Sequence, residues 1–179
     1  MIILVGASAS GKTEVAKYLI KNYGFEKVVT FTTRVKRPGE IDKIDYNFVT
    51  KDQFLKLKDE NFFVETTYYN GNYYGTPKDE IALNKVLIVD PNGLKCFINL
   101  SDKSIITFLI YGSEEKRRER MILRGDNIKD VEQRLINDKV DFDQKNIEKT
   151  NFEIDGDNLT IQQMSELIYN NYKKTVKIN

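Results

Sequence analysis

The stretch MIILVGASASGKTEVAKYLI, residues 1–20, decides the fold of this chain. It begins with a short apolar run rich in isoleucine that ends at Gly6, the pattern of a buried parallel strand. Residues 6–13, GASASGKT, match the pattern G-x-x-x-x-G-K-[ST] in full, and a helical stretch follows at about 12–22. This order of strand, glycine-rich loop and helix predicts a phosphate-binding loop.

The chemistry of such a loop follows from its backbone. Glycines let main-chain amides turn toward phosphate oxygens, and the helix N-terminus adds a partial positive charge. Lys12 would reach the β- and γ-phosphates of a nucleotide, and the Thr13 hydroxyl would bind Mg²⁺. GTP switches, motor ATPases and small-molecule kinases share this loop, so it predicts a nucleoside triphosphate, usually ATP, without choosing a reaction. We expect the donor to contact the whole loop: Gly6, Ala7, Ser8, Ala9, Ser10, Gly11, Lys12 and Thr13.

The rest of the chain alternates apolar strands with helices. Strands are expected at 28–31, 85–90, 104–111 and 151–154, and helices at 50–60, 114–124, 127–148 and 160–173. Thr50 with Gln53 forms a capping-box signature, and Ser113 can cap the helix that follows it. The alternation indicates an α/β fold, a mostly parallel sheet flanked by helices.

Residues 32–84 interrupt that alternation with a polar, aromatic-rich stretch that looks inserted. Within it, residues 62–76 alternate around an Asn-Gly turn and predict a small antiparallel hairpin. The Arg-Gly-Asp sequence at 124–126 is interpreted as a hinge into a second, smaller insertion.

Composition excludes several classes of function. The 179 residues suit one compact domain, and 28 basic against 27 acidic residues argue against wholesale binding to nucleic acid or anionic membrane. With no histidine and only Cys96, histidine-based triads and zinc sites are excluded, as is an intrachain disulfide. Neither a signal peptide nor a membrane span is expected, so we predict a cytoplasmic protein.

The segment TTRVKRPGEIDKIDYNF, residues 32–48, holds Arg34 and Arg37 beside a Pro-Gly turn that forbids a regular helix. Arginine suits bidentate binding of phosphate or carboxylate. Most loop arginines are solvated surface charges, and this stretch taken alone leaves both interpretations open.

The order of phosphate loop, TTRVKRPGEIDKIDYNF, FVETTYYNGNYYGT and RMILRGDNIKDVEQRL resembles the guanylate kinase family, from residue 2 to about 145. The resemblance implies transfer of a phosphoryl group from Mg·ATP to GMP, and to dGMP as well. It implies a P-loop NTPase-type core at 1–31, 85–123 and 147–179. A mixed α/β nucleoside-monophosphate-binding subdomain at 32–84 and a helical lid at 124–146 would complete the fold.

Residue roles follow from the same resemblance. Arg34, Arg37, Tyr46 and Tyr74 would hold the phosphate of GMP, and charge-assisted hydrogen bonds to a dianion suit that task. A second set would recognise guanine or lie beside it: Glu65, Thr30 and Thr76. A carboxylate is the natural acceptor for the N1–H and exocyclic amine of guanine. Aromatic residues in a hairpin more often serve packing, so the role of the tyrosines depends on the resemblance.

The resemblance also assigns the lid arginines. Arg124 and Arg134 would close over the transferring phosphoryl group together with Arg37, and with Lys12 they form the predicted catalytic set. Arg120 would lie on the donor side. A solvated charged face is expected to account for Arg117 and Arg118.

Several residues depart from the family pattern. Ala7 and Ala9 replace the usual proline and glycine of the loop, and Ile88 replaces an acidic residue near the acceptor. Asp90 is the expected carboxylate near Mg²⁺, although an aspartate at a strand end can equally cap a helix. Asp155-Gly156-Asp157 replaces the Asn-Asp of the family near the adenine.

These departures keep other functions open. The acceptor could be dGMP alone or a ribose phosphate, although Glu65 disfavours the latter. The domain could be a non-catalytic peptide-binding module, although such modules usually have a degraded phosphate loop. A nucleic-acid-dependent ATPase fits the charge balance worse. We therefore expect small-molecule substrates, no nucleic-acid or membrane partner, and a monomer or homodimer.

Overall fold

The main sheet has five strands, all of them parallel, in the order β2-β7-β1-β8-β9. The computed structural model describes residues 1–69 and 71–177. The strands are β1 (Ile2–Val5), β2 (Glu26–Lys27), β7 (Lys85–Ile88), β8 (Ile106–Tyr111) and β9 (Phe152–Asp155). The expectation of a mostly parallel sheet flanked by helices is thus confirmed.

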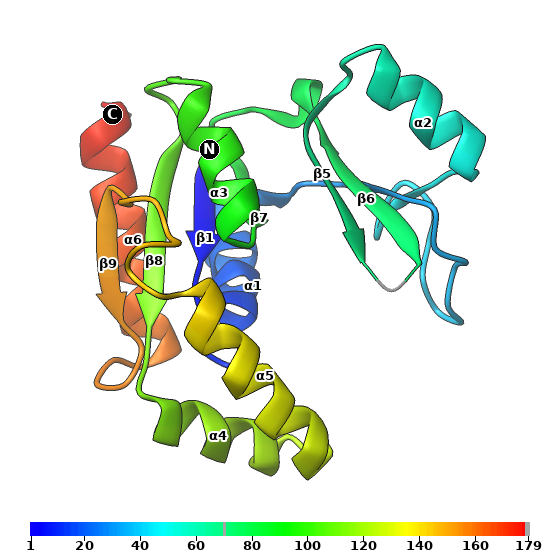
Figure 1. Cartoon of the computed structure of the whole chain (residues 1–179). Coiled ribbons are helices and arrows are strands. Elements are labelled where there is room, and N and C mark those ends of the chain that lie inside the picture. The colour runs from blue at the N-terminus through cyan, green and yellow to red at the C-terminus, as the bar shows by residue number, and fades with distance from the viewer. Residues whose placement is uncertain (70, 178–179) are drawn as a thin grey trace.

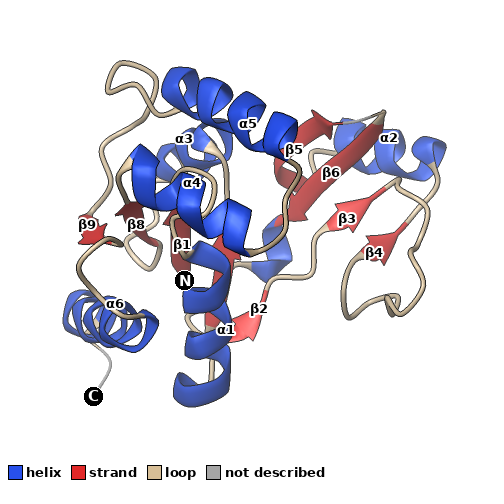
Figure 2. Cartoon of the chain, turned by 90° about the horizontal axis from the view of Figure 1, so that it is seen from below, coloured by secondary structure: helices blue, strands red, loops and turns tan. Residues whose placement is uncertain are grey.

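Helices cover both faces of this sheet (Figures 1 and 2). On one face lie α1 (Lys12–Tyr23) and α6 (Ile161–Val176), and on the other lies α3 (Pro91–Asn99). Side chains alternate across a strand, so Ile2 and Leu4 join the α1–α6 core while Ile3 and Val5 join the α3 core. All four are fully buried, which explains why β1 is a continuous apolar run.

A second, mixed sheet has the order β4-β3-β6-β5 and lies to one side of the first (Figure 1). Its strands are β3 (Phe31–Thr32), β4 (Asn47–Phe48), β5 (Phe63–Tyr69) and β6 (Asn72–Pro77), followed by a 3₁₀ turn η1 (Lys78–Glu80). The helix α2 (Lys51–Asp59) covers the sheet through Phe54, whose ring stacks 4.7 Å from that of Phe63. The expected hairpin and the capping box of α2 are confirmed. The asparagine of the expected turn, residue 70, lies outside the described residues.

The helices α4 (Glu114–Leu123) and α5 (Ile128–Asp141) follow β8, whose carboxyl end lies beside the phosphate loop. They are held together by a small buried cluster of Met121, Val131 and Leu135, against which Ala9 of the loop packs. Ser113 caps α4 as expected, accepting a hydrogen bond from the backbone nitrogen of Lys116.

Two elements differ from the sequence interpretation. Of the expected strand at 28–31 only Phe31 lies in a strand, because Glu26–Lys27 pairs in the first sheet and Phe31–Thr32 in the second. The expected helix at 127–148 ends at Asp141. No element was expected at residues 91–99, where α3 forms; Asp90 caps this helix, and Pro91 occupies its first turn, where no backbone donor is needed.

Across the described ranges, no helix is long and apolar enough to cross a membrane. The division into a core, an inserted subdomain at 32–84 and a lid at 124–146 stays a prediction, since it concerns how the segments move.

Candidate active site

The phosphate loop joins β1 to α1 through a close backbone approach. Gly6 has φ of +155°, and a Cβ atom there would lie 2.2 Å from the carbonyl oxygen of Ile110 on β8. Only glycine therefore fits between the two strands. At the other end of the loop, α1 begins after Gly11 without a side-chain cap, which leaves its first backbone N–H groups available to an anion.

Lys12 folds back over this loop. Its Nζ donates hydrogen bonds to the carbonyl oxygens of Gly6 at 2.6 Å and Ala7 at 2.8 Å. Burial lowers the pKa of Lys12 to about 8, while the negative charge of Asp138 acts in the opposite direction. Ala9, where the family usually has glycine, adopts a left-handed conformation with φ of 59°.

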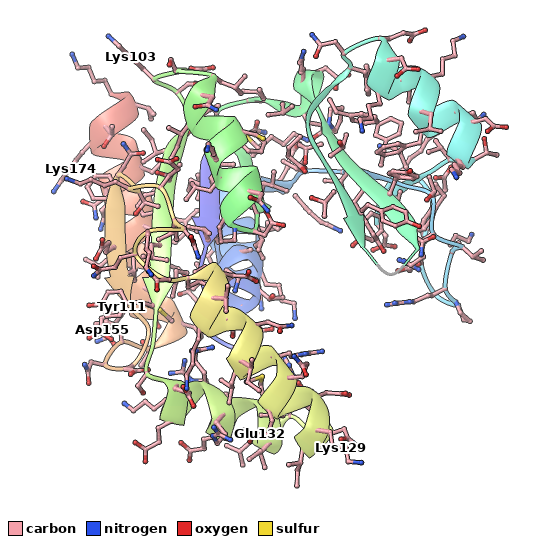
Figure 3. The ribbon with its side chains drawn as sticks, viewed as in Figure 1. Lys103, Tyr111, Lys129, Glu132, Asp155 and Lys174 are labelled. Carbon is pink, nitrogen blue, oxygen red and sulfur yellow. The ribbon has the colours of Figure 1, made fainter. Side chains whose placement is uncertain are left out.

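A buried ion pair fixes the loop from outside. Asp138 on α5 accepts hydrogen bonds from the backbone nitrogen of Ser8 at 3.0 Å and from its hydroxyl at 3.2 Å. The same carboxylate pairs with Arg117 of α4 at 2.5 Å, and both side chains are more than 90% buried. The expectation that Arg117 belongs to a solvated face is wrong, because helical spacing does not show which arginine points inward. Arg118 is half-exposed and pairs with Glu114 and Glu132, the latter labelled in Figure 3.

A cavity of about 640 Å³ opens beside the loop, where the sequence predicts the phosphoryl donor, and is called the donor cavity below. Its lining includes Lys12, Thr13, Arg120 and Arg124 together with the apolar Leu159, Ile161 and Met164. An apolar wall next to a phosphate loop is suited to a nucleotide base.

Arg120 connects the loop to the segment after β9. It donates hydrogen bonds to the carbonyl oxygens of Ala9 at 3.2 Å and Gly156 at 2.5 Å. This segment begins where Tyr111 and Asp155 end β8 and β9 side by side (Figure 3). A Cβ atom on Gly156 would lie 2.8 Å from the carbonyl oxygen of Ser10, so the departure from the family at Gly156 allows the segment to contact the loop.

A second cavity, of about 230 Å³, lies between the two sheets, where the sequence predicts the acceptor, and is called the acceptor cavity below. It brings together six of the residues expected from the sequence: Thr30, Tyr46, Glu65, Tyr74, Thr76 and Asp90. Oε1 of Glu65 accepts a hydrogen bond from the Thr76 hydroxyl at 2.6 Å. Burial raises the pKa of Glu65, and the hydrogen bond from Thr76 opposes that shift. The cavity thus presents a half-buried carboxylate whose charge a ligand with hydrogen-bond donors would stabilise.

Arg34 lies next to the tyrosines of this cavity. Its guanidinium carbon is 5.4 Å from the ring centroid of Tyr46, and that ring lies 6.2 Å from the ring of Tyr74. Glu40 holds Arg34 through an ion pair at 2.7 Å and accepts a hydrogen bond from the backbone nitrogen of Arg37 at 2.8 Å. The side chain of Arg37 is exposed and does not line the cavity.

The two arginines expected in the lid lie together. Arg124 donates to both carboxylate oxygens of Asp126, and Nη1 of Arg134 lies 3.2 Å from Oδ2 of the same residue. Both arginines are at least half-exposed. Arg124 also lines the donor cavity, whereas Arg134 does not.

The two residues expected near Mg²⁺ line different cavities. Thr13 lines the donor cavity and Asp90 the acceptor cavity, and one oxygen of Asp90 caps α3 by accepting from the nitrogen of Gly93 at 2.7 Å. Among the described residues, no group of three acidic, histidine or cysteine side chains could hold a metal ion. Mg²⁺ keeps several waters and usually takes only one or two carboxylates beside substrate phosphates, so a hydroxyl and one carboxylate fit it chemically.

Three acidic residues at the site were missed from the sequence. Glu40 follows the Pro-Gly turn directly and could have been identified as a partner for Arg34 from its spacing. Asp126 stands in the interpreted hinge, and its proximity to Arg124 was visible. No sequence signal distinguished Asp138 from the other charged residues of α5, because its burial depends on how α4 and α5 pack.

Comparison with known proteins gives the family. The guanylate kinase family model matches residues 1–170. Guanylate kinase from Wolinella succinogenes is 35% identical over 73% of this chain, and that from Clostridium tetani is 36% identical over 70%. The matches span 65% and 63% of those relatives, less than two thirds of their length.

A crystal structure of guanylate kinase from Anaplasma phagocytophilum shares the fold. It has a TM-score of 0.64 and 23% sequence identity, and the match covers 97% of this chain and 84% of that one. The structural likeness confirms the fold, and the family model and the curated relatives confirm the resemblance drawn from the motifs: the chain belongs to the guanylate kinase family.

Proposed function

We propose that this protein transfers the γ-phosphoryl group of Mg·ATP to GMP, and to dGMP, giving ADP and the nucleoside diphosphate. One observation carries the proposal: the chain combines a complete phosphate loop with a separate cavity lined by the half-buried carboxylate of Glu65. Family membership supports the same reaction.

On the acceptor side, Glu65 would accept hydrogen bonds from N1–H and the amine of guanine, with Thr30 and Thr76 beside it. Thr76 already orients the carboxylate. Three further residues would hold the phosphate of GMP: Arg34, Tyr46 and Tyr74. Arg34 lies next to Tyr46 and Tyr46 next to Tyr74, so one guanidinium and two phenols would be available as donors to a dianion.

On the donor side, the loop 6–13 would bind the triphosphate of ATP, with Arg120 beside the base. Lys12 would exchange its bonds to loop carbonyls for phosphate oxygens. Thr13 and Asp90 would hold Mg²⁺, which supplies positive charge to the phosphates when bound.

In the transfer step, a phosphate oxygen of GMP attacks the γ-phosphorus while the bond to the β–γ bridging oxygen breaks. The acceptor is already anionic, so no histidine base is required. Positioning and charge neutralisation are sufficient for such a reaction, and Lys12, Arg37, Arg124 and Arg134 would provide them. Arg37 is exposed and Arg124 is paired with Asp126, so movement of the segments 32–84 and 124–146 must bring them together.

An assay of ADP release tests the proposal, with Mg·ATP and each of GMP, dGMP, AMP, UMP and CMP offered separately. Turnover with the two guanine nucleotides alone is expected. In the cell we place this reaction in the cytoplasm, the compartment that holds these substrates. A protein that binds ATP but forms no GDP would refute the proposal. Sedimentation of the same sample distinguishes monomer from homodimer.

A further inference from the structure

The carboxylate of Asp126 joins the two arginines expected over the transferring phosphoryl group. Oδ1 accepts from Nε of Arg124 at 3.0 Å, and Oδ2 accepts from both Arg124 and Arg134. Within the described part of the chain, neither guanidinium has another ion-pair partner. Asp126 therefore uses both oxygens on these two residues.

The position of Asp126 in the fold makes this pairing local and stable. It follows Gly125 directly after α4, and Arg134 lies two turns into α5, so one carboxylate bridges two helices. The side chain of Asp126 is only 19% exposed, compared with 56% for Arg124 and 50% for Arg134. The arginines are accessible to a ligand while their counter-ion is largely covered.

The negative charge of Asp126 weakens the attraction between the donor cavity and an anionic ligand. Arg124 lines that cavity beside Lys12, and the triphosphate of ATP is a polyanion. With Asp126 ionised, the three side chains carry a net charge of about +1, whereas the two arginines alone would carry about +2. The arginines favour that ionisation, since hydrogen bonding by Arg124 lowers the pKa of Asp126.

We infer that Asp126 is a positioning residue that holds Arg124 and Arg134 together before substrate binds and competes with the nucleotide phosphates for them. It thereby sets the strength with which the segment 124–146 closes on ATP. The inference rests on the proposed function, because it assumes that these arginines contact a phosphoryl group. An exposed ion pair changes an equilibrium constant by up to about fivefold, so the competition is strong enough to measure and weak enough to be reversible.

The test is Mg·ATP binding without any acceptor, measured by calorimetry at low and physiological salt for the wild type, Asp126→Asn and Asp126→Glu. Asp126→Asn keeps the size of the side chain and removes its charge. We expect its Kd for Mg·ATP to fall about three- to tenfold, with a steeper dependence on salt, because two ion pairs no longer compete. Asp126→Glu retains the charge and should stay within about twofold of the wild type.

Glu119→Gln is the matched control, because it removes one exposed carboxylate from α4 that is neither three nor four residues from Arg124 or Arg134. Its Kd should not change. An unchanged or weaker Kd for Asp126→Asn, or an equal gain for Glu119→Gln, would overturn the inference. Thermal unfolding of each variant separates this result from loss of folded protein, since a purely structural role would weaken binding rather than strengthen it.

The outcome is separable from that of the proposed function. If ATP binds more tightly to Asp126→Asn while the wild type forms no GDP, the inference holds and the assignment of the acceptor fails. If the wild type forms GDP while the wild type and Asp126→Asn bind ATP with equal affinity, the proposed function holds and the inference fails. A wild-type protein that does not bind Mg·ATP would overturn both.

Discussion

Asp138 of α5 binds Ser8 of the phosphate loop through both of its carboxylate oxygens, at 3.0 Å to the backbone nitrogen and 3.2 Å to the hydroxyl. The two residues are 130 positions apart in the chain. Arg117 completes the group by pairing with the same carboxylate and by donating to the carbonyl oxygen of Ser8 at 3.3 Å. The shape of the loop thus depends on a helix of the expected lid.

Removing one partner of this pair should be far more costly than removing both. Asp138→Ala leaves a buried guanidinium without its counter-ion, and we expect the free energy of unfolding to fall by about 3–5 kcal/mol. The double variant Arg117→Met/Asp138→Leu replaces the pair with apolar side chains and should recover most of that loss. Urea unfolding of the wild type, the single variant and the double variant measures the difference. Equal losses in the two variants would show that the cost comes from the lost contacts of Asp138 and not from an uncompensated buried charge.

The close approach at Gly6 predicts a second effect on the loop. Gly6→Ala places a methyl group 2.2 Å from the carbonyl oxygen of Ile110, so β1 and β8 must separate locally. We expect a loss of stability of about 3 kcal/mol or more, together with loss of Mg·ATP binding.

Gly24→Ala is the control for Gly6→Ala. Gly24 also has a positive φ, of 70°, but a Cβ atom there meets nothing within 4 Å. Its cost should be limited to the left-handed conformation, about 1–2 kcal/mol, with ATP binding retained. If thermal denaturation gave equal losses for the two variants, the contact with Ile110 would not explain the need for glycine.

Burial of Lys12 predicts a dependence of ATP affinity on pH. Its pKa of about 8 in the free protein is below the ordinary value of 10.5, so the amine loses its proton as the pH rises through 8. Phosphate oxygens favour the charged amine, and affinity for Mg·ATP should fall above pH 8, approaching tenfold per pH unit. The effect on the free energy of unfolding has the opposite sign. Between about pH 8 and 10.5 the Lys12 amine is protonated in the unfolded chain but not in the folded one, so the stability of the fold increases as the pH rises through that interval.

Calorimetric Kd values for Mg·ATP at pH 7 to 9.5 test this dependence. Lys12→Met should bind weakly, with an affinity that does not change over the same range. A wild-type Kd that stays constant to pH 9.5 would show that the amine remains charged throughout.

The elements that the sequence predicts well are those with a strong local signal. β1 and the loop after it combine a continuous apolar run with a complete motif, and α2 carries its capping box on Thr50 and Gln53. Such features depend on neighbours in the chain, so sequence suffices. The helix α3 was not predicted; its start depends on Asp90 as its cap and on Pro91 being compatible with the first turn of a helix.

The candidate site shows the same division. Motif resemblance identified Glu65 and Tyr74, and the structure places both in one cavity. It could not identify Asp138 as the partner of Arg117, because charged residues on a helix look alike until packing decides which side is covered. The counter-ions of a phosphate site are therefore harder to predict than its cations.

Glu65 gives the sharpest test of base recognition. Its carboxylate can accept from N1–H and the exocyclic amine of guanine together, whereas the amide of Glu65→Gln offers one acceptor and directs a donor at another donor. Charge-assisted hydrogen bonds contribute about 1.5–3 kcal/mol each, so kcat/KM for GMP should fall about a hundredfold or more. Inosine monophosphate lacks the amine, so its kcat/KM should fall less in the variant than that of GMP. The kcat/KM for GMP divided by that for inosine monophosphate should therefore be lower in Glu65→Gln than in the wild type.

The raised pKa of Glu65 adds a pH dependence to this ratio. Burial moves the pKa above the ordinary value of 4.5, and a protonated carboxyl cannot accept both hydrogen bonds from guanine. Preference for GMP over inosine monophosphate should therefore be full at high pH and decline as the pH falls through the raised pKa. Both nucleotides carry the same phosphate, so its own titration cancels in the ratio. Kinetics between pH 5 and 8 for the wild type and Glu65→Gln measure this, and a preference that declines equally in both proteins would place guanine recognition elsewhere.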